Sequence, residues 1–139
     1  MYLVDTDVLS EARKGDLADP GVRAFFREAH AARQALYLSV VTVGEVRRGI
    51  ERIRHRGDTQ QAERLEVWLG QAIETAAERI LPVDADTAQV WGRMRVPHPE
   101  NPLDKLIAAT ALLHDLVVVT RNGRHFSGLG VRVLDPFHS

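Results

Sequence analysis

Four acidic side chains occupy positions where carboxylates can do chemistry. Asp5 and Asp7 end the apolar run YLV near the amino terminus. Glu45 follows a second apolar run, and Asp104 opens a third. Carboxylates at the ends of buried segments are unfavourable unless a metal ion, a cationic side chain or helix amides pair with them. A hard divalent cation such as Mg²⁺ or Mn²⁺ takes oxygen ligands and works on phosphate substrates, so this residue set indicates phosphoester chemistry.

Each of these carboxylates also has a structural interpretation. Thr42 and Glu45 fit a capping box, because a threonine precedes a glutamate by three residues. Asp104 suits a helix amino terminus electrostatically, and Asp7 can cap a helix over VLSEARK. For one residue the structural interpretation is as good as the functional one. The set of four favours a shared site, because like charges gathered together need a counterion to stay ionised.

The elements that must position these residues are short strands that alternate with helices. Five apolar runs predict the strands, at 1–4, 35–41, 79–83, 116–120 and 131–135. Unbroken runs of Val, Ile and Leu suit strands covered on both faces, and strand–helix alternation is typical of a parallel sheet. We therefore predict an α/β sandwich. The carboxyl ends of parallel strands meet at one edge, so the four carboxylates are expected to converge there.

Two segments are predicted helices with different surroundings. Residues 60–77 carry an apolar stripe at helical spacing, which predicts a helix packed on the core or on a sister subunit. Residues 106–114 are apolar on nearly all sides, which predicts a buried helix. Asn101 can cap that helix and Pro102 fits its first position, so the loop PHPENP precedes it.

The composition limits the classes of protein and of site. A chain of 139 residues that is 45% hydrophobic suits one domain over 1–139. The sequence has no cysteine, which excludes disulfides, thiolate metal sites and cysteine nucleophiles. The amino terminus lacks a basic leader, and no apolar run approaches the roughly 20 residues of a membrane helix. We expect a soluble protein of the cytoplasm, without membrane association.

One basic segment stands out from a chain whose net charge is −1. Residues 47–56 hold five arginines and one glutamate, so this segment is +4 and the remainder is −5. The arginines are Arg47, Arg48, Arg52, Arg54 and Arg56. Such a segment is either a solvated helix face or a surface that binds phosphates.

Four motifs in order resemble the PIN-domain ribonucleases, most closely the VapC and FitB toxins of bacterial toxin–antitoxin pairs. They are LVDTDVLSE, EVRRGIER, LDKLIAATA and VVTRNGRHF, and the ending GVRVLDPF is also similar. Any one motif is weak evidence, but the four occur in order and the resemblance extends over nearly the whole chain. The resemblance implies a single PIN domain over 1–139. Its fold would be a three-layer sandwich with a central, mostly parallel five-stranded sheet flanked by helices.

The resemblance also implies roles for particular residues. By motif, Asp5, Glu45 and Asp104 would hold Mg²⁺ or Mn²⁺ and carry catalysis. Thr6 matches the polar residue beside the first aspartate. Asp7 stands where the family usually has asparagine, so we expect it to be a neighbour of the site.

The sequence departs from the family pattern after the fourth expected strand. A further acidic residue is common there, but this chain has Asn122 and His125 at the matching positions. Asn122 can offer a carbonyl oxygen or orient a metal-bound water, and His125 can ligate Mn²⁺, contact RNA or be a surface histidine. Thr120 is a further accessory candidate. The departure weakens the case for a second metal ion. The remaining histidines show no metal-ligand spacing: His30, His55, His98, His114 and His138.

The function expected from these residues is metal-dependent endoribonuclease activity. A metal-bound water would attack phosphorus in line, and Arg121 would help to neutralise the developing charge. Arg48 and Arg52 lie three or four residues apart on the helix of Glu45, so they can lead an RNA backbone towards the metal. The resemblance further implies a cognate VapB- or FitA-like antitoxin and a homodimer.

Two other functions remain open. A PIN domain that lacks one carboxylate can bind RNA or a partner without cleaving. Alternatively, VDTDV resembles the DxD motif of aspartyl-phosphate phosphatases, with Asp5 as nucleophile and Asp7 as acid–base. That class would need a phosphate-binding lysine, and the chain has only Lys14 and Lys105.

Overall fold

The centre of the molecule is one parallel sheet of five strands. The computed structural model describes residues 1–137, so His138 lies outside the described residues. The strand order is β3-β2-β1-β4-β5, and all four pairings are parallel, as predicted. The strands are β1 (Tyr2–Val4), β2 (Leu36–Ser39), β3 (Ile80–Leu81), β4 (Val117–Val119) and β5 (Val133–Leu134).

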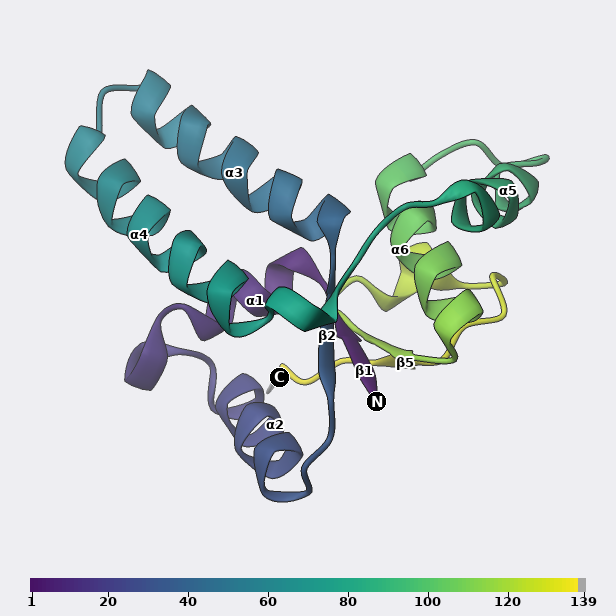
Figure 1. Cartoon of the computed structure of the whole chain (residues 1–139), viewed down its shortest axis with the longest axis horizontal. Coiled ribbons are helices and arrows are strands. Elements are labelled where there is room, and N and C mark those ends of the chain that lie inside the picture. The colour runs from purple at the N-terminus through teal and green to yellow at the C-terminus, as the bar shows by residue number, and fades with distance from the viewer. Residues whose placement is uncertain (138–139) are drawn as a thin grey trace.

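Helices connect the strands and cover the sheet (Figure 1). The α-helices are α1 (Thr6–Ala12), α2 (Pro20–Ala31), α3 (Val40–His55), α4 (Thr59–Thr75), α5 (Ala85–Met94) and α6 (Pro102–His114). Three short 3₁₀ segments are η1 (Gly15–Leu17), η2 (Ala77–Arg79) and η3 (Gly123–Phe126). No helix among residues 1–137 is both long enough and apolar enough to span a membrane.

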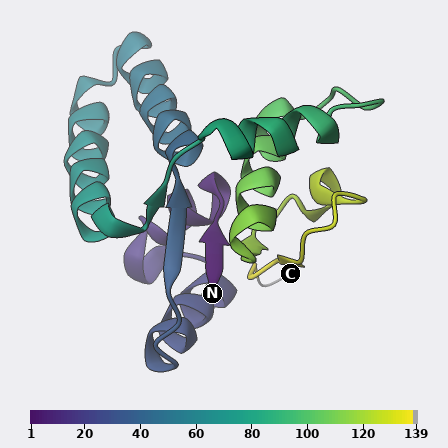
Figure 2. The same cartoon turned by 45° about the vertical axis from the view of Figure 1, so that its right-hand side comes forward.

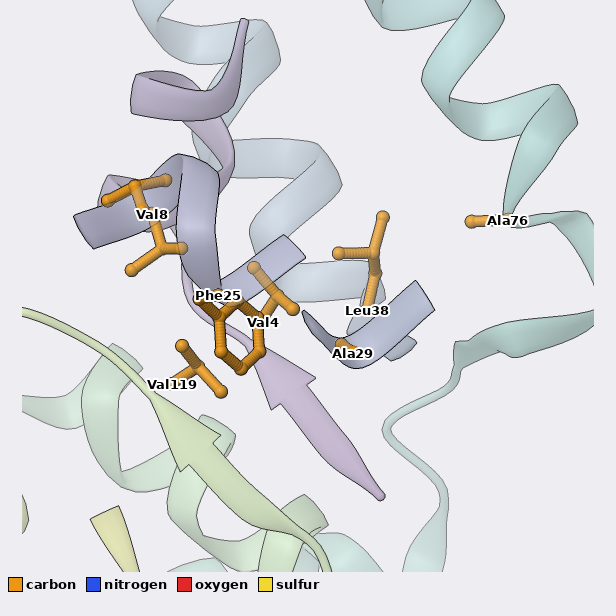
Figure 3. Packing of buried hydrophobic residues seen from close by; sticks show 8 residues of the cluster. Val4, Val8, Phe25, Ala29, Leu38, Ala76 and Val119 are labelled. Atoms are coloured by element: carbon orange, nitrogen blue, oxygen red, sulfur yellow. The ribbon is translucent and has the colours of Figure 1, made fainter. Parts of the chain in front are cut away.

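Alternating side chains on the central strands divide the core into two layers. Val4 and Val119 lie in a cluster with Val8 of α1 and Phe25 of α2 (Figure 3). Leu3 and Val118 belong to a second cluster, which includes Ile107 and Ala108 of α6, and Phe126. Because successive strand residues point to opposite faces, both faces of the sheet are buried. The three-layer sandwich predicted from the sequence is confirmed.

Helices α3 and α4 form an antiparallel pair that extends from the sheet on the side away from α5 and α6 (Figures 1 and 2). Val46 and Ile50 of α3 pack on Ala62 and Leu69 of α4 in a third buried cluster. Leu9 of α1 lies against this cluster, so the pair is anchored to the body of the molecule. The helix predicted over 60–77 therefore exists, and its apolar stripe faces α3 and the core.

The second strand ends two residues earlier than its apolar run. Ser39 accepts a hydrogen bond from the Val41 amide, at 3.0 Å, and so caps α3. The capping box predicted at Thr42 and Glu45 is wrong, because both residues are already inside the helix. The Thr42 hydroxyl is buried without a hydrogen-bond partner among residues 1–137.

Helix α6 is buried over most of its length, as its composition predicts. Lys105 and the residues from Ile107 to Ala111 are buried, but Leu112 and Leu113 are exposed. The expectation of burial throughout is therefore wrong for the last turn. Asn101 precedes the helix in a left-handed conformation, with φ of 54°, and its side chain forms no capping hydrogen bond. Pro102 occupies the first turn, as predicted.

Candidate active site

Asp5 lies directly after β1 and is tightly held. Its Oδ1 accepts a hydrogen bond from the Thr6 amide at 2.8 Å, and its Oδ2 accepts one from Thr120 Oγ1 at 2.9 Å. Asp5 is only 5% exposed to solvent. Thr6 begins α1 and Thr120 follows β4, so two adjacent parallel strands bring these groups together. This is the carboxyl edge at which the sequence predicted a site.

Asp7 joins the same group from the first turn of α1. Its Oδ2 accepts hydrogen bonds from the Arg121 amide at 3.0 Å and from Thr120 Oγ1 at 3.4 Å. Its Oδ1 accepts one from the Val8 amide at 2.7 Å. Asp5 is the residue that caps α1, so the alternative in which Asp7 caps this helix is wrong. Asp7 instead ties α1 to the end of β4.

Burial and mutual repulsion make these carboxylates hard to ionise. Burial raises the pKa of Asp5 from 3.8 to about 6, with further increases from the charges of Asp7 and Asp104 and opposition from the hydrogen bonds of Thr6 and Thr120. Burial also raises the pKa of Asp7, against the hydrogen bonds of the Arg121 and Val8 amides and of Thr120, while the Asp104 charge adds to the increase. The three aspartates therefore lie within one another's field.

Asp104 is hydrogen-bonded to His125, one of the two positions at which the family resemblance implies an acidic residue. His125 Nδ1 lies 2.7 Å from Asp104 Oδ2. His125 belongs to η3, which the buried Phe126 anchors against α6. His125 is thus a neighbour of the acidic group rather than a free surface histidine. The Asn122 amide donates to Thr120 Oγ1 at 3.1 Å, while the Asn122 side chain forms no hydrogen bond within residues 1–137.

Glu45 is placed differently from the three aspartates. It lies half-buried in the second turn of α3. Together with Thr6, Arg48 and Arg52 it lines a groove of about 320 Å³ between α1, α3 and α4. Thr6 adjoins Asp5, so the groove begins beside the aspartate group.

The donor set suits a divalent cation, although no enclosed cage has formed. Within residues 1–137, no three acidic or histidine side chains stand close enough together to hold a metal ion. Burial, with the charges of neighbouring aspartates, raises the pKa of Asp5 and of Asp7, and a cation placed between such carboxylates would favour their ionised form. Carboxylate oxygens are the ligands that Mg²⁺ and Mn²⁺ prefer. Asp5 and Asp104 would hold such an ion, with Asp7 adjacent and Glu45 on the facing helix.

The basic segment of α3 divides into paired and unpaired arginines. Arg47 and Arg54 bind Glu51 and Glu66 at distances between 2.5 and 3.2 Å. Arg48 and Arg52 form no ion pair within the described residues, and both line an open cavity of about 690 Å³. Arg56, which follows the helix, forms none either, so the unpaired arginines within α3 itself are the two that the sequence assigned to RNA.

Arg121 makes its contacts away from the carboxylates. Its guanidinium lies 4.3 Å from the centre of the Phe137 ring, and only its backbone amide reaches Asp7. A cation held over an aromatic face is partly satisfied by that ring. Its role towards RNA stays a prediction.

Sequence reasoning missed a second group of cations beside Asp104. Arg93, Lys105 and Arg124 line a cavity of about 540 Å³, together with His125. Lys105 follows Asp104 directly in the sequence, which was the available signal. The arginines come from segments about 30 residues apart, so no local pattern joins them.

The geometry agrees with comparisons to known proteins. The sequence profile of the PIN domain matches residues 2–130. The VapC ribonuclease Y4jK of Sinorhizobium fredii is 31% identical over 143 residues, which cover 99% of this chain and 98% of the relative. The toxin FitB of Neisseria gonorrhoeae is 32% identical over 144 residues, which cover 99% of both. The crystal structure of FitAcB from Neisseria gonorrhoeae matches with a TM-score of 0.84 at 30% identity, covering 100% of both chains. The chain therefore belongs to the PIN-domain family, in the group that includes VapC and FitB proteins.

Proposed function

We propose that residues 1–139 form a single PIN domain that acts as a metal-dependent endoribonuclease, the toxin of a type II toxin–antitoxin pair. The observation that carries this proposal is the pair of carboxylates, Asp5 and Asp7, that shares the Thr120 hydroxyl at the carboxyl edge of the sheet, with the Asp104 charge near enough to raise the pKa of both. The two curated relatives are named as a ribonuclease and as a toxin. A site with one buried and further partly buried carboxylates suits metal-dependent hydrolysis of a phosphodiester in such a chain.

The chain's own residues would position the reaction. Asp5 is fixed by Thr6 and Thr120, and His125 orients the Asp104 carboxylate. When bound, Mg²⁺ or Mn²⁺ supplies Lewis acidity and lowers the pKa of a bound water. Glu45, which lines the same groove as Thr6, would complete the ligand set from α3. Arg48 and Arg52, on the same helix, attract the phosphates of the substrate strand.

The proposed partners are RNA, a VapB- or FitA-like antitoxin and a second copy of the chain. Solved structures similar to this chain include a FitAB complex bound to a DNA fragment, with a TM-score of 0.82 at 30% identity. By analogy, the antitoxin would bind this chain and hold it inactive in the cytoplasm.

Purified chain, free of antitoxin, tests the proposal with single-stranded and folded RNA in Mg²⁺ or Mn²⁺. We expect cleavage by the wild type, and a loss of at least about a hundredfold in Asp5→Asn, because electrostatic and metal-binding groups contribute effects of that size. Asp16→Asn, at an exposed aspartate of η1, is the matched control and should cleave normally. A folded Asp5→Asn variant with full activity would contradict the proposed site.

A second candidate function is RNA binding without cleavage. The observation that favours it is His125 beside Asp104, where family members commonly carry a carboxylate. If the wild type binds RNA but does not cleave it in Mg²⁺ or in Mn²⁺, this second function is supported and the first is excluded. The phosphatase alternative gains no support, because Lys14 pairs with Glu11, and Lys105 lines a cavity whose lining includes neither Asp5 nor Asp7.

A further inference from the structure

The cavity of about 540 Å³ is lined by Lys105, which follows Asp104 in the sequence, and by His125, which contacts Asp104. Its walls are the end of α5, the 95–101 connection, the start of α6 and the η3 segment, on the right-hand side of Figure 1. This volume falls in the range of about 300–1,000 Å³ that is usual for ligand pockets. We call it the Lys105 cavity, after the one buried charged side chain that lines it.

The Lys105 cavity carries an excess of positive charge. Arg93 and Arg124 are exposed on its walls and form no ion pair within residues 1–137. Glu100 is the one carboxylate among its lining residues, and it faces His98 at 3.7 Å. The cavity therefore favours an anion.

Lys105 is the strongest indication of a ligand. Lys105 is only 4% exposed to solvent. Its ammonium group donates a hydrogen bond to the His98 carbonyl, and in the described part of the chain it contacts no carboxylate. A buried charge without an opposite charge is unfavourable. An anionic oxygen in the cavity would supply the missing partner.

His125 connects the Lys105 cavity to the candidate active site. This residue lines the cavity, while its Nδ1 lies 2.7 Å from Asp104 Oδ2. A ligand that occupies both places must carry anionic groups in succession. A nucleic-acid strand does so, with one phosphate for each nucleotide.

We propose that the Lys105 cavity binds a phosphate of the RNA strand adjacent to the phosphate that is cleaved. The inference rests on the proposed ribonuclease function and deepens it. Lys105, Arg93 and Arg124 hold this flanking phosphate, and the strand then runs past His125 to the aspartates. Arg48 and Arg52 of α3 contact the strand elsewhere.

The test is equilibrium binding of a labelled single-stranded RNA of about ten nucleotides in EDTA, as a function of salt. The variant Arg93→Gln/Arg124→Gln removes both exposed charges of the cavity. Arg23→Gln/Arg27→Gln is the matched control, because it removes two exposed arginines from α2. Lys105→Met removes the buried ammonium group. If Lys105→Met impairs folding, the Arg93→Gln/Arg124→Gln variant still tests the cavity.

We expect several-fold weaker binding in the cavity variants and a salt slope shallower by about 0.7, the value for one phosphate contact on a single strand. In Mg²⁺ or Mn²⁺ the same variants should raise KM more than they lower kcat. The α2 control should match wild type in affinity, salt slope, KM and kcat.

The outcomes separate this inference from the proposed function. If the wild type cleaves RNA and the cavity variants behave like the α2 control, the cavity assignment is overturned, but the proposed ribonuclease function stands. Cavity-dependent RNA binding without cleavage supports the cavity and overturns the ribonuclease. A third outcome is that the cavity variants bind RNA as the α2 control does but no longer bind an acidic peptide. This outcome would also overturn the assignment of the cavity to RNA.

Discussion

The carboxylates of the candidate site are held in two opposite ways. At the β1–β4 edge, Asp5 is buried and each of its oxygens accepts a hydrogen bond. On α3, Glu45 is half-buried and accepts no hydrogen bond within residues 1–137. Hydrogen bonds fix the position of the Asp5 side chain, although burial makes its ionisation unfavourable. The Glu45 side chain has no such bonds, so it can change its conformation. Under the proposed function, such a site would be completed by a cation and the substrate.

The largest expected effect comes from removing the buried charge. A shift of the Asp5 pKa from 3.8 to about 6 corresponds to about 3 kcal/mol. Because the folded pKa is raised, ionised Asp5 destabilises the folded state above pH 6, and the effect disappears below pH 3.8, where both states are protonated. Asp5→Asn, which can still cap α1, should therefore raise metal-free stability by up to about 3 kcal/mol above pH 6.

Denaturant unfolding of the metal-free protein across pH measures this effect. The gain in Asp5→Asn should shrink as pH falls from about 6 towards 4, while Asp16→Asn should show no such trend. A gain that is equally large at low pH would mean that packing, not charge, sets the difference.

The next effect sharpens the contrast between the β1–β4 edge and α3. Glu45→Gln should leave metal-free stability within about 0.5 kcal/mol of wild type, because the side chain is only half-buried and lacks hydrogen-bond partners in the described structure. It should nevertheless lose most of the stabilisation by Mg²⁺ or Mn²⁺, which is about 2.7 kcal/mol at a hundred times Kd. Thermal unfolding with and without metal measures both quantities.

Glu63→Gln, at an exposed glutamate of α4, is the matched control for Glu45. An unchanged metal response in Glu45→Gln would remove this residue from the ligand set. The site would then consist of the aspartates alone.

A smaller effect is expected where the family's carboxylate is replaced. His125→Asp would set a new carboxylate beside Asp104, so repulsion would raise the demand for a cation. We expect metal affinity to rise about tenfold, or about 1.4 kcal/mol, as measured by calorimetry. His125→Asn removes the imidazole without adding charge. Equal metal affinity in the two variants would show that position 125 does not face the ion.

The sequence predicted the sheet because its central strands, β1, β2 and β4, are continuous apolar runs, which are recognised without tertiary information. The rule that parallel strands end at one edge predicted that Asp5, Asp7, Glu45 and Asp104 would meet there. The structure brings Asp5 and Asp7 together through Thr120, whereas a site shared by all four stays a prediction. The start of α3 was misplaced because the β-branched run VVTV continues past Ser39, and the Ser39 cap decides the boundary.

Contacts between distant segments could not be read from the sequence. The His125–Asp104 contact joins residues 21 positions apart and depends on how η3 packs against α6. Lys105 looks like a solvent-exposed lysine in sequence, since its burial arises from the fold of the 95–101 connection around it. Such residues are identified only when the tertiary structure is known.

The smallest expected effect separates two kinds of arginine on α3. Arg48→Gln/Arg52→Gln should make the salt slope of RNA binding shallower by about 1.4, if each side chain contacts one phosphate. Arg47→Gln/Arg54→Gln removes the same charge, but these guanidinium groups already bind Glu51 and Glu66, so phosphate contacts would first have to displace carboxylates. We expect a smaller change in slope for this second pair, measured with the same RNA in EDTA. Equal slopes in the two variants would show that α3 acts through its summed charge, and the distinction between paired and unpaired arginines would have no consequence for RNA binding.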